Sequence, residues 1–316
     1  MNRRSAVRRL LAAGAGSLFT RLGAAQKSGP EESTELPTFE SDVRLVLLDV
    51  SVKDKKGDRI LGLPKESFSV FENGRSQPIT VFERNDLPVT VGILVDESRS
   101  MAPKRGDVLI AAQTFIEESN PLDETFVLNF NDTVKPGLPP GTIFSDDLKQ
   151  LRSALYRGVS EGRTALNDAV VAGLKQLELG RTDKKALILI SDGGDNASHH
   201  TRHETLLALE ESMATVYAIG LFAPEDDKEM DPGILRQLAR ISGGEAFFPA
   251  TPADMIPVCR GIAKDIRTRY TIGYRPQANG REPLRHIRVG VSARGHSRLI
   301  VRTRASYRFD RGESRN

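Results

Sequence analysis

Two apolar runs, each leading into an aspartate, constrain most strongly what this chain can fold into. Residues 89–95 read VTVGILV and precede Asp96, and residues 186–190 read ALILI and precede Ser191 and Asp192. A strand that is apolar on both faces needs cover on both sides, as a central strand of a parallel sheet has. The two runs therefore predict central strands of an α/β protein.

Helical and strand patterns alternate between and after these runs. Apolar residues recur at helical spacing directly after the first run. Strands alternating with helices predict a doubly wound, mostly parallel α/β domain over residues 88–268. Strands are expected at 89–95, 125–130, 186–191 and 216–222, and helices at 108–116, from about 145, from about 164, at 204–213, at 234–241 and at 252–268.

The flanks of this domain have a strand period instead. In the N-terminal flank, 40–87, the runs FSVFE and PITVFE surround Asn73-Gly74, a dipeptide that favours a tight turn and so predicts a hairpin between the two runs. The C-terminal flank, 269–308, alternates at 270–274, 287–291 and 299–301. Because each flank is short for a core of its own, we expect them to pair into one small β module, a sandwich beside the α/β domain.

The first 25 residues have the plan of an export signal. Arg3, Arg4, Arg8 and Arg9 precede a short apolar stretch, and small residues follow at 23–25. The arginine pairs are typical of the twin-arginine type rather than the general one. We expect an exported, periplasmic or secreted bacterial protein, with a cytoplasmic protein as the alternative. Residues 26–39 indicate a linker and 309–316 a tail.

Removal of this segment changes the charge balance. It holds five arginines and no acid, so the 45 basic residues fall to 40 against 42 acidic ones. A net-charge argument for nucleic acid disappears with it, and we expect no nucleic-acid partner. No apolar run approaches the roughly 20 residues of a membrane span, so we expect no stable membrane span.

Three oxygen-rich loops lie at or beside the ends of predicted strands. They cover residues 96–100 (DESRS), 162–168 (GRTALND) and 191–195 (SDGGD). In a doubly wound sheet the loops at the carboxyl ends of the strands converge and collect ligands. We therefore expect the polar side chains of these three loops to lie together.

The side chains that these loops offer suit a hard cation. They include two carboxylates and three hydroxyls, without sulfur or imidazole, and the expected ligands are Asp96, Ser98, Ser100, Thr164 and Asp192. Oxygen donors favour Mg²⁺, with Mn²⁺ or Ca²⁺ as alternatives. An ion held largely by neutral hydroxyls keeps a position that can take a carboxylate from a partner. The simpler alternative is a set of helix caps, since Asp, Ser and Thr are good N-cap residues.

The order Asp-x-Ser-x-Ser, then Thr, then Asp-Gly resembles the metal-ion-dependent adhesion site of von Willebrand factor type A domains. The resemblance implies that Ser98 and Ser100 bind the metal directly and Thr164 in some states. It implies that Asp96 and Asp192 act mainly through water or hydrogen bonds. The flanks, with VKDKKGD, FSVFENG and YTIGYRP, resemble a bacterial subgroup of VWFA-related domain proteins, and the resemblance covers about 40–308.

The expected function is a non-enzymatic, divalent-metal-dependent, adhesion-type binding module in the bacterial envelope. Its metal would bridge to an Asp or Glu of a partner protein. The alternative is a structural subunit of a larger assembly in which the metal is only structural. A hydrolase is a more distant alternative, because no motif places a histidine to activate a serine. The partner's identity and the oligomeric state stay open.

Three further features have two interpretations each. Arg99 and Arg163 either attract an acidic partner or pair with Glu97 and Glu161, and pairing is the simpler interpretation. His199 and His203 either share a zinc ion or lie at a solvated helix entrance. Residues 281–316 hold ten arginines against three acids; these either bind an anionic partner, such as nucleic acid or an envelope polymer, or face solvent on edge strands.

Overall fold

The computed structural model describes residues 45–84, 86–222, 230–276, 283–296 and 298–308. The predicted export signal (1–25), linker (26–39) and tail (309–316) lie outside the described residues.

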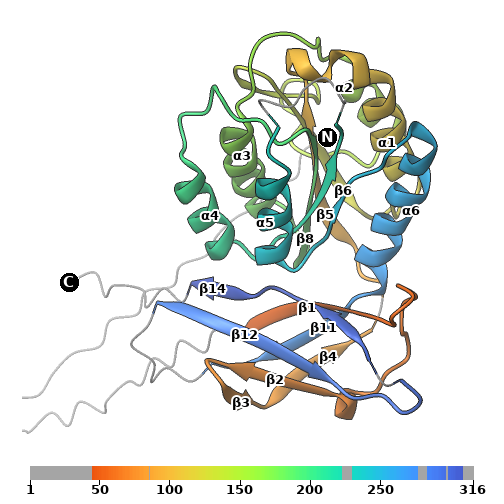
Figure 1. Ribbon diagram of the computed structural model, residues 1–316, viewed down its shortest axis with the longest axis vertical. Coiled ribbons are helices and arrows are strands. Elements are labelled where there is room, and N and C mark those ends of the chain that lie inside the picture. Colours follow the sequence, from red (N-terminus) through yellow and green to blue (C-terminus); the bar gives the residue numbers. More distant parts are fainter. Residues whose placement is uncertain (1–44, 85, 223–229, 277–282, 297, 309–316) are drawn as a thin grey trace, which may run out of the picture. The chain divides into compact units, whose positions relative to one another are not determined.

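A six-stranded sheet forms the centre of the α/β domain (Figure 1). Its strand order is β10-β9-β8-β5-β6-β7, and all neighbours run parallel except the pair β6 and β7. The prediction of a doubly wound, mostly parallel sheet is confirmed. The strands are β5 (Val89–Asp96), β6 (Glu124–Phe130), β7 (Val134–Pro136), β8 (Lys184–Ser191), β9 (Thr215–Gly220) and β10 (Ala246–Phe247).

Helices cover both faces of this sheet. Helices α3, α4 and α5 lie on one side and α1 and α6 on the other (Figure 1). Among the described residues, no helix has the length and apolarity that crossing a membrane requires. The helices are α1 (Arg105–Glu117), α2 (Leu148–Tyr156), α3 (Leu166–Glu178), α4 (Arg202–Glu211), α5 (Pro232–Ser242) and α6 (Pro252–Thr268), with a 3₁₀ segment, η2 (Arg99–Lys104), before α1.

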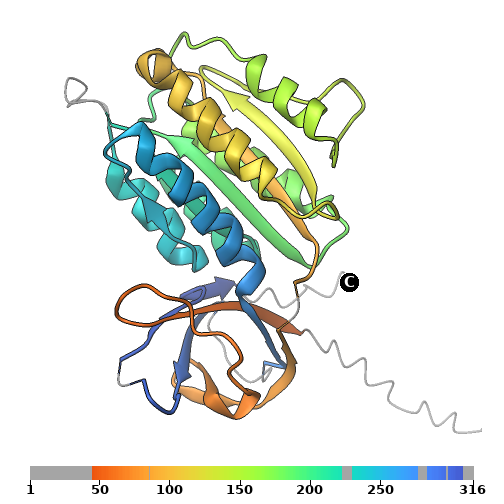
Figure 2. The same ribbon diagram turned by 90° about the vertical axis from the view of Figure 1, so that its right-hand side faces the viewer.

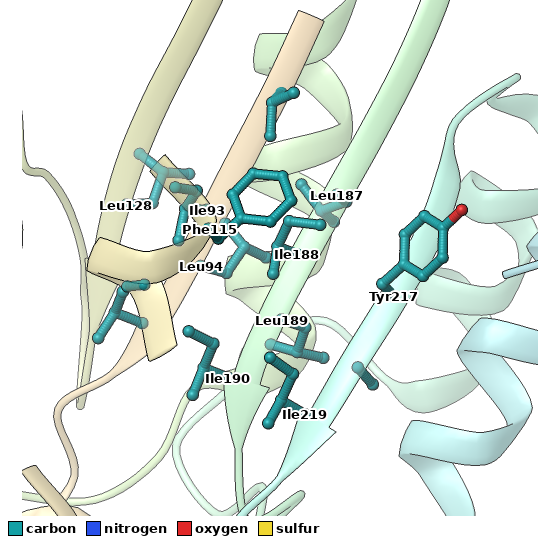
Figure 3. Close-up of a cluster of buried hydrophobic side chains, with 14 of the residues drawn as sticks. Ile93, Leu94, Phe115, Leu128, Leu187, Ile188, Leu189, Ile190, Tyr217 and Ile219 are labelled. Atoms are coloured by element: carbon teal, nitrogen blue, oxygen red, sulfur yellow. The ribbon is translucent and has the colours of Figure 1, made fainter. Parts of the chain in front are cut away.

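The core explains why the two apolar runs are central strands. Ile93 and Leu94 point to opposite faces of β5, and both are fully buried, as are Ile188 and Leu189 of β8. Figure 3 shows Ile93 and Ile188 near Phe115 of α1, whereas Leu94 lies on the other face of the sheet, next to Gly173 of α3. Each buried aliphatic side chain stabilises the fold by about 1.5–3 kcal/mol, so helices on both faces are needed to retain this energy.

The flanks form two four-stranded sheets, in the orders β13-β1-β11-β4 and β14-β12-β2-β3 (Figure 2). Each sheet combines strands from before and after the α/β domain, as predicted. Alternate residues of β1, including Leu48 and Val50, meet Val70 of β2 and Ile272 of β11 in a shared core. The strands are β1 (Val46–Lys53), β2 (Phe68–Glu72), β3 (Arg75–Gln77), β4 (Ile79–Glu83), β11 (Tyr270–Tyr274), β12 (Leu284–Val291), β13 (Ile300–Arg302) and β14 (Ser306–Arg308), with a short 3₁₀ turn, η1 (Lys65–Ser67).

The prediction of a hairpin at Asn73-Gly74 was correct for the turn and wrong for the second strand. Asn73 and Gly74 have positive φ, 46° and 78°, and they join β2 to β3. The run predicted as the partner, PITVFE, forms β4 in the other sheet, paired with β11. Pro78 lies between β3 and β4. Because proline has no backbone N–H to donate to a ladder, the strand ends there and the chain crosses to the second sheet.

A buried ionic cluster joins the module to α6. The carboxylate of Asp265 accepts hydrogen bonds from Ser51 of β1 (2.8 Å) and from Tyr217 of β9 (2.7 Å). Arg269 donates to the same carboxylate at 2.9 and 3.0 Å, and the ammonium of Lys53 lies 3.8 Å away. Asp265 is 3% exposed, so nearly all of this charge is balanced inside the protein.

The cluster also sets the ionisation of Asp265. Burial by itself would raise the pKa of Asp265, but the charges of Arg269 and Lys53 and the hydrogen bonds outweigh it and hold the pKa well below its usual value. A depressed pKa in the folded state stabilises the fold above the unfolded pKa of about 4. That stabilisation is lost as the pH falls below this value.

Asp265→Asn should lower the free energy of unfolding by about 3–5 kcal/mol at neutral pH, because it leaves buried cations without their carboxylate. Urea unfolding measures the loss, and the gap to wild type should narrow as the pH falls below about 4. Lys264→Gln, at an exposed position of the same helix, is the control and should change stability by less than about 0.5 kcal/mol. A small, pH-independent effect of Asp265→Asn would contradict the assigned role.

Candidate metal centre

The pairing of β5 with β8 brings the first and third loops together. The register aligns Val95 with Ile190, so Asp96 and Ser191 are neighbours at the carboxyl ends of adjacent strands. The chain leaves β5 toward β6 on one side and returns through α3 to β8 on the other. This reversal of direction is the switch point at which doubly wound sheets bind ligands.

Asp96 is the most buried acid of the site. It is 1% exposed, and its carboxylate accepts hydrogen bonds from the Ser98 amide (2.9 Å) and the Ser191 hydroxyl (2.6 Å). Burial raises the pKa of Asp96 to about 7; the two serines oppose the shift, and the nearby charge of Asp192 adds to it. A cation at this position would relieve the cost of keeping the carboxylate charged.

The two serines of the first loop present their hydroxyls side by side. The Oγ atoms of Ser98 and Ser100 lie 3.1 Å apart. Ser98 is buried, whereas Ser100 is partly exposed at the start of η2. Their spacing turns both hydroxyls to one side of the loop, as expected from the alternation Asp-x-Ser-x-Ser.

Thr164 belongs to a loop that is fastened to both of the others. Its amide donates to the side chain of Asn196 at 2.8 Å, and its carbonyl accepts from the Asn196 amide at 2.9 Å. Two residues earlier, the carbonyl of Gly162 accepts from the amide of Arg99 at 3.2 Å. The middle loop therefore lies between the first and third loops, and Thr164 is 4% exposed.

Asp192 is buried and has a cation of its own. One carboxylate oxygen accepts from the amide of Gly194 at 3.1 Å. The other lies 3.8 Å from the ammonium of Lys104, whose side chain is 8% exposed. Gly193, between Asp192 and Gly194, has a φ of 85°. A Cβ at this position would lie 2.4 Å from the carbonyl of Asp231, so the turn requires glycine.

The residue between Asp96 and Ser98 anchors the first loop. Glu97 is 2% exposed, and its carboxylate pairs with the guanidinium of Arg105 and accepts from the hydroxyl of Ser160 at 3.3 Å. Arg105 also donates to the carbonyl of Gly158 at 2.6 Å. Burial raises the pKa of Glu97, against the lowering effect of Arg105. The loop is thereby fastened to the start of α1 and to the α2–α3 connection.

The predicted pairing of Arg99 and Arg163 with Glu97 and Glu161 was wrong. Glu97 pairs with Arg105, and Arg163 pairs with Asp132 at 3.0 Å. The reason is geometric: Glu97 turns inward beneath the loop, whereas Arg99 is exposed. Among the described residues, no ion pair of Arg99 is found.

Sequence reasoning missed three contributors to the site: Ser191, Glu97 and Lys104. Ser191 could have been found, because it ends a predicted strand adjacent to that of Asp96. Glu97 was placed at a variable position of the motif, and its burial depends on Arg105 eight residues later. Nothing in the sequence distinguishes Lys104 from an exposed lysine at a helix start.

The candidate donors are oxygen atoms of the kind that hard cations take. The two carboxylates and three hydroxyls come from three loops joined by hydrogen bonds at one end of the sheet, and such oxygens are the ligands of Mg²⁺ and Ca²⁺. Within the described part of the chain, no group of three or more His, Cys, Asp or Glu side chains could hold a metal. His199 and His200 instead lie with their Nδ1 atoms 3.1 and 2.6 Å from the Asp168 carboxylate, so a zinc site at His199 and His203 has no support.

The family follows from sequence as well as fold. A family model of the von Willebrand factor type A domain matches residues 90–256, more than half of the chain. The chain therefore belongs to the von Willebrand factor type A family. Such domains are typically adhesion and protein-interaction modules, generally without enzymatic activity, and commonly bind a divalent metal at the adhesion site. Comparison with curated proteins gives no match.

Solved structures share the fold at low sequence identity. A von Willebrand factor type A protein from Catenulispora acidiphila is 14% identical, with a TM-score of 0.50 over 87% of this chain and 76% of that one. The corresponding domain of the type V pilus tip protein Mfa5 from Porphyromonas gingivalis is 11% identical, with 0.44 over 57% and 95%. Proximal thread matrix protein 1 from the mussel byssus, in a structure with a zinc-occupied MIDAS motif, is 17% identical, with 0.47 over 58% and 49%.

Arg105→Gln should destabilise the fold by about 1.5–3 kcal/mol, because Glu97 keeps its burial and loses its charged hydrogen-bond partner. Urea unfolding measures the change, and hydrogen exchange should accelerate at residues 96–100. Adding Glu97→Gln should recover much of the loss, since it removes the unpaired charge. If the double variant is no more stable than Arg105→Gln, the pair does not anchor the loop.

Proposed function

We propose that this protein is a non-enzymatic, divalent-metal-dependent binding module that captures a protein partner through an acidic side chain. The observation that carries the proposal is the side-by-side placement of the Ser98 and Ser100 hydroxyls, 3.1 Å apart, above the buried Asp96. In this proposal Ser98 and Ser100 bind the metal directly, with Thr164 joining them in some states. Asp96 and Asp192 act mainly through water or hydrogen bonds.

The proposed metal is Mg²⁺, with Mn²⁺ or Ca²⁺ as alternatives. When bound, it supplies an electrophilic position for an Asp or Glu carboxylate of the partner. The residues of this chain orient it: Ser191 and the Ser98 amide hold Asp96 in place, and the Glu97–Arg105 pair fixes the loop from below. Arg99 and Arg163 are both exposed on the loops around the site and favour an acidic surface.

The arrangement of the serines supports binding rather than hydrolysis. The Ser98 hydroxyl bonds to Ser100, and the described histidines nearest in sequence to the third loop, His199 and His200, pair with Asp168. Among the described residues, no histidine is hydrogen-bonded to Ser98, as the activation of a serine nucleophile would require. The export pattern of residues 1–25 supports a place in the bacterial periplasm or outside the cell.

Ser98→Ala combined with Ser100→Ala should weaken Mn²⁺ binding by at least about tenfold, because two ligand oxygens are lost. Titration followed by Mn²⁺ electron paramagnetic resonance measures this directly, and unchanged unfolding shows that the fold survives. Ser153→Ala, an exposed serine of α2, is the control. Wild-type protein that binds no Mn²⁺, Mg²⁺ or Ca²⁺ would refute the metal site.

Partner capture tests the binding function. Immobilised protein incubated with envelope extract in Mg²⁺ should retain a partner that EDTA releases, and Asp96→Ala and the double serine variant should lose it. Capture that survives EDTA and both variants would favour the alternative, a structural subunit of a larger assembly with a structural metal. Metal-dependent turnover of a phosphate or acyl substrate would instead favour a hydrolase.

Lys104→Met should tighten metal binding roughly tenfold. The substitution removes a buried positive charge beside Asp192, and this charge repels the metal ion. The same Mn²⁺ titration measures the gain, and Lys149→Met, an exposed lysine of α2, should leave the affinity unchanged. Equal or weaker affinity in Lys104→Met would show that the ammonium does not oppose the metal.

A further inference from the structure

A second concave site lies between the α/β domain and the β module. A cavity of about 640 Å³ has walls from α5 and β10 on one side and from β12 and β13 on the other. Cavities of roughly 300–1,000 Å³ are the usual size of ligand sites. No residue of the three oxygen-rich loops (96–100, 162–168 and 191–195) lines this cavity, so the cavity is separate from the candidate metal centre.

The charge of the lining is strongly one-sided. Its only acid, among the described residues, is Glu245, which is already bound by Lys53 and by Arg302, each at 2.7 Å. The arginines that line the cavity are Arg236, Arg240, Arg288, Arg302 and Arg304. Arg304 is buried and donates to the carbonyl of Ser212 at 2.6 Å, which leaves three exposed arginines in excess.

Two of these three arginines have guanidinium groups that stack on aromatic rings. Arg236 and Arg240 lie one turn apart on α5, and Arg288 lies on β12. The guanidinium of Arg236 lies 4.3 Å from the ring centroid of Phe248, and that of Arg288 lies 4.1 Å from the centroid of Phe71. Stacking holds the flat face of a guanidinium and leaves its edge N–H groups free for a carboxylate.

The lining of the cavity also includes apolar residues. They are Ile287 and Val289, which are 9% and 8% exposed, and Val301. A ligand that matches this lining therefore carries both acidic groups and apolar groups.

A peptide has this combination, and single-stranded nucleic acid fits less well. Nucleic-acid sites of this kind stack bases on free aromatic faces. Phe248, the only aromatic side chain lining this cavity among the described residues, already has Arg236 over it and Phe222 stacked on it at 5.5 Å. An extended peptide turns alternate side chains to opposite sides, so acidic and apolar side chains can meet different parts of the lining.

We propose that this cavity binds an extended acidic segment of a protein partner, with acidic side chains on Arg236 and Arg240 and apolar side chains against the apolar part of the lining. The C-terminal arginines thus have two roles. Arg285 and Arg304 are buried and structural, whereas Arg288 and Arg302 line a binding site. The site works without a metal, so it goes beyond the metal-dependent capture proposed above.

The test uses a fluorescent five-residue peptide of alternating glutamate and valine, with anisotropy as the readout. The full-length protein should bind it saturably, with or without EDTA, and should bind the glutamine–valine version far more weakly. Combining Arg236→Gln with Arg240→Gln, both exposed on α5, should weaken binding about tenfold, as two exposed charge pairs allow. Added salt should weaken binding to wild type as well.

Arg152→Gln combined with Arg260→Gln is the matched control, since it removes the same charge from exposed positions elsewhere and should leave the affinity unchanged. The proposal is overturned if the glutamate peptide does not bind, or if the two double variants bind it equally. It is also overturned if an oligothymidylate displaces the peptide and binds more tightly, because the site would then serve nucleic acid. Insensitivity to EDTA separates any of these results from the fate of the metal centre.

Discussion

The register between β5 and β8 is the constraint on which the candidate metal centre depends. Pairing Val95 with Ile190 sets Asp96 against Ser191 and leaves Asp192 one residue further on. Each carboxylate is then buried beside the other, which is costly unless hydrogen bonds or cations offset it. The Ser191 hydroxyl, the Ser98 amide and Lys104 provide that compensation. A shift of one residue along the strands would separate these groups and leave the acids without partners.

Strong local patterns made the sheet and the loop ends predictable. The apolar runs before Asp96 and Asp192 require burial on both faces, and Asp-x-Ser-x-Ser turns alternate side chains to one side of a loop. The sequence could not show which cation meets which buried acid, because Arg105 reaches Glu97 only after η2 brings α1 back to the loop. Pro78 could have predicted the strand partner of β2. A proline at this position ends β3 and separates it from the run PITVFE, which forms β4 in the other sheet.

The C-terminal arginines show a further limit of composition. Arg285 is buried against Glu72 at 3.2 Å, and Arg288, three residues along the same strand, is exposed over Phe71. One residue type therefore fills a core position and an exposed position within a single strand, because the two arginines lie on opposite faces of β12. The two proposed sites also differ in kind, since one requires a metal to hold a carboxylate and the other uses arginines directly.

The Asp265 cluster has a consequence for how the chain can be divided. The carboxylate belongs to α6, but Ser51 and Lys53, which contact it, belong to β1, which precedes the α/β domain in the chain. The module is completed only by strands that follow α6. Neither part can bury its charges alone, so both should unfold in one cooperative transition. The α/β domain should therefore not fold stably when it is expressed without its flanks.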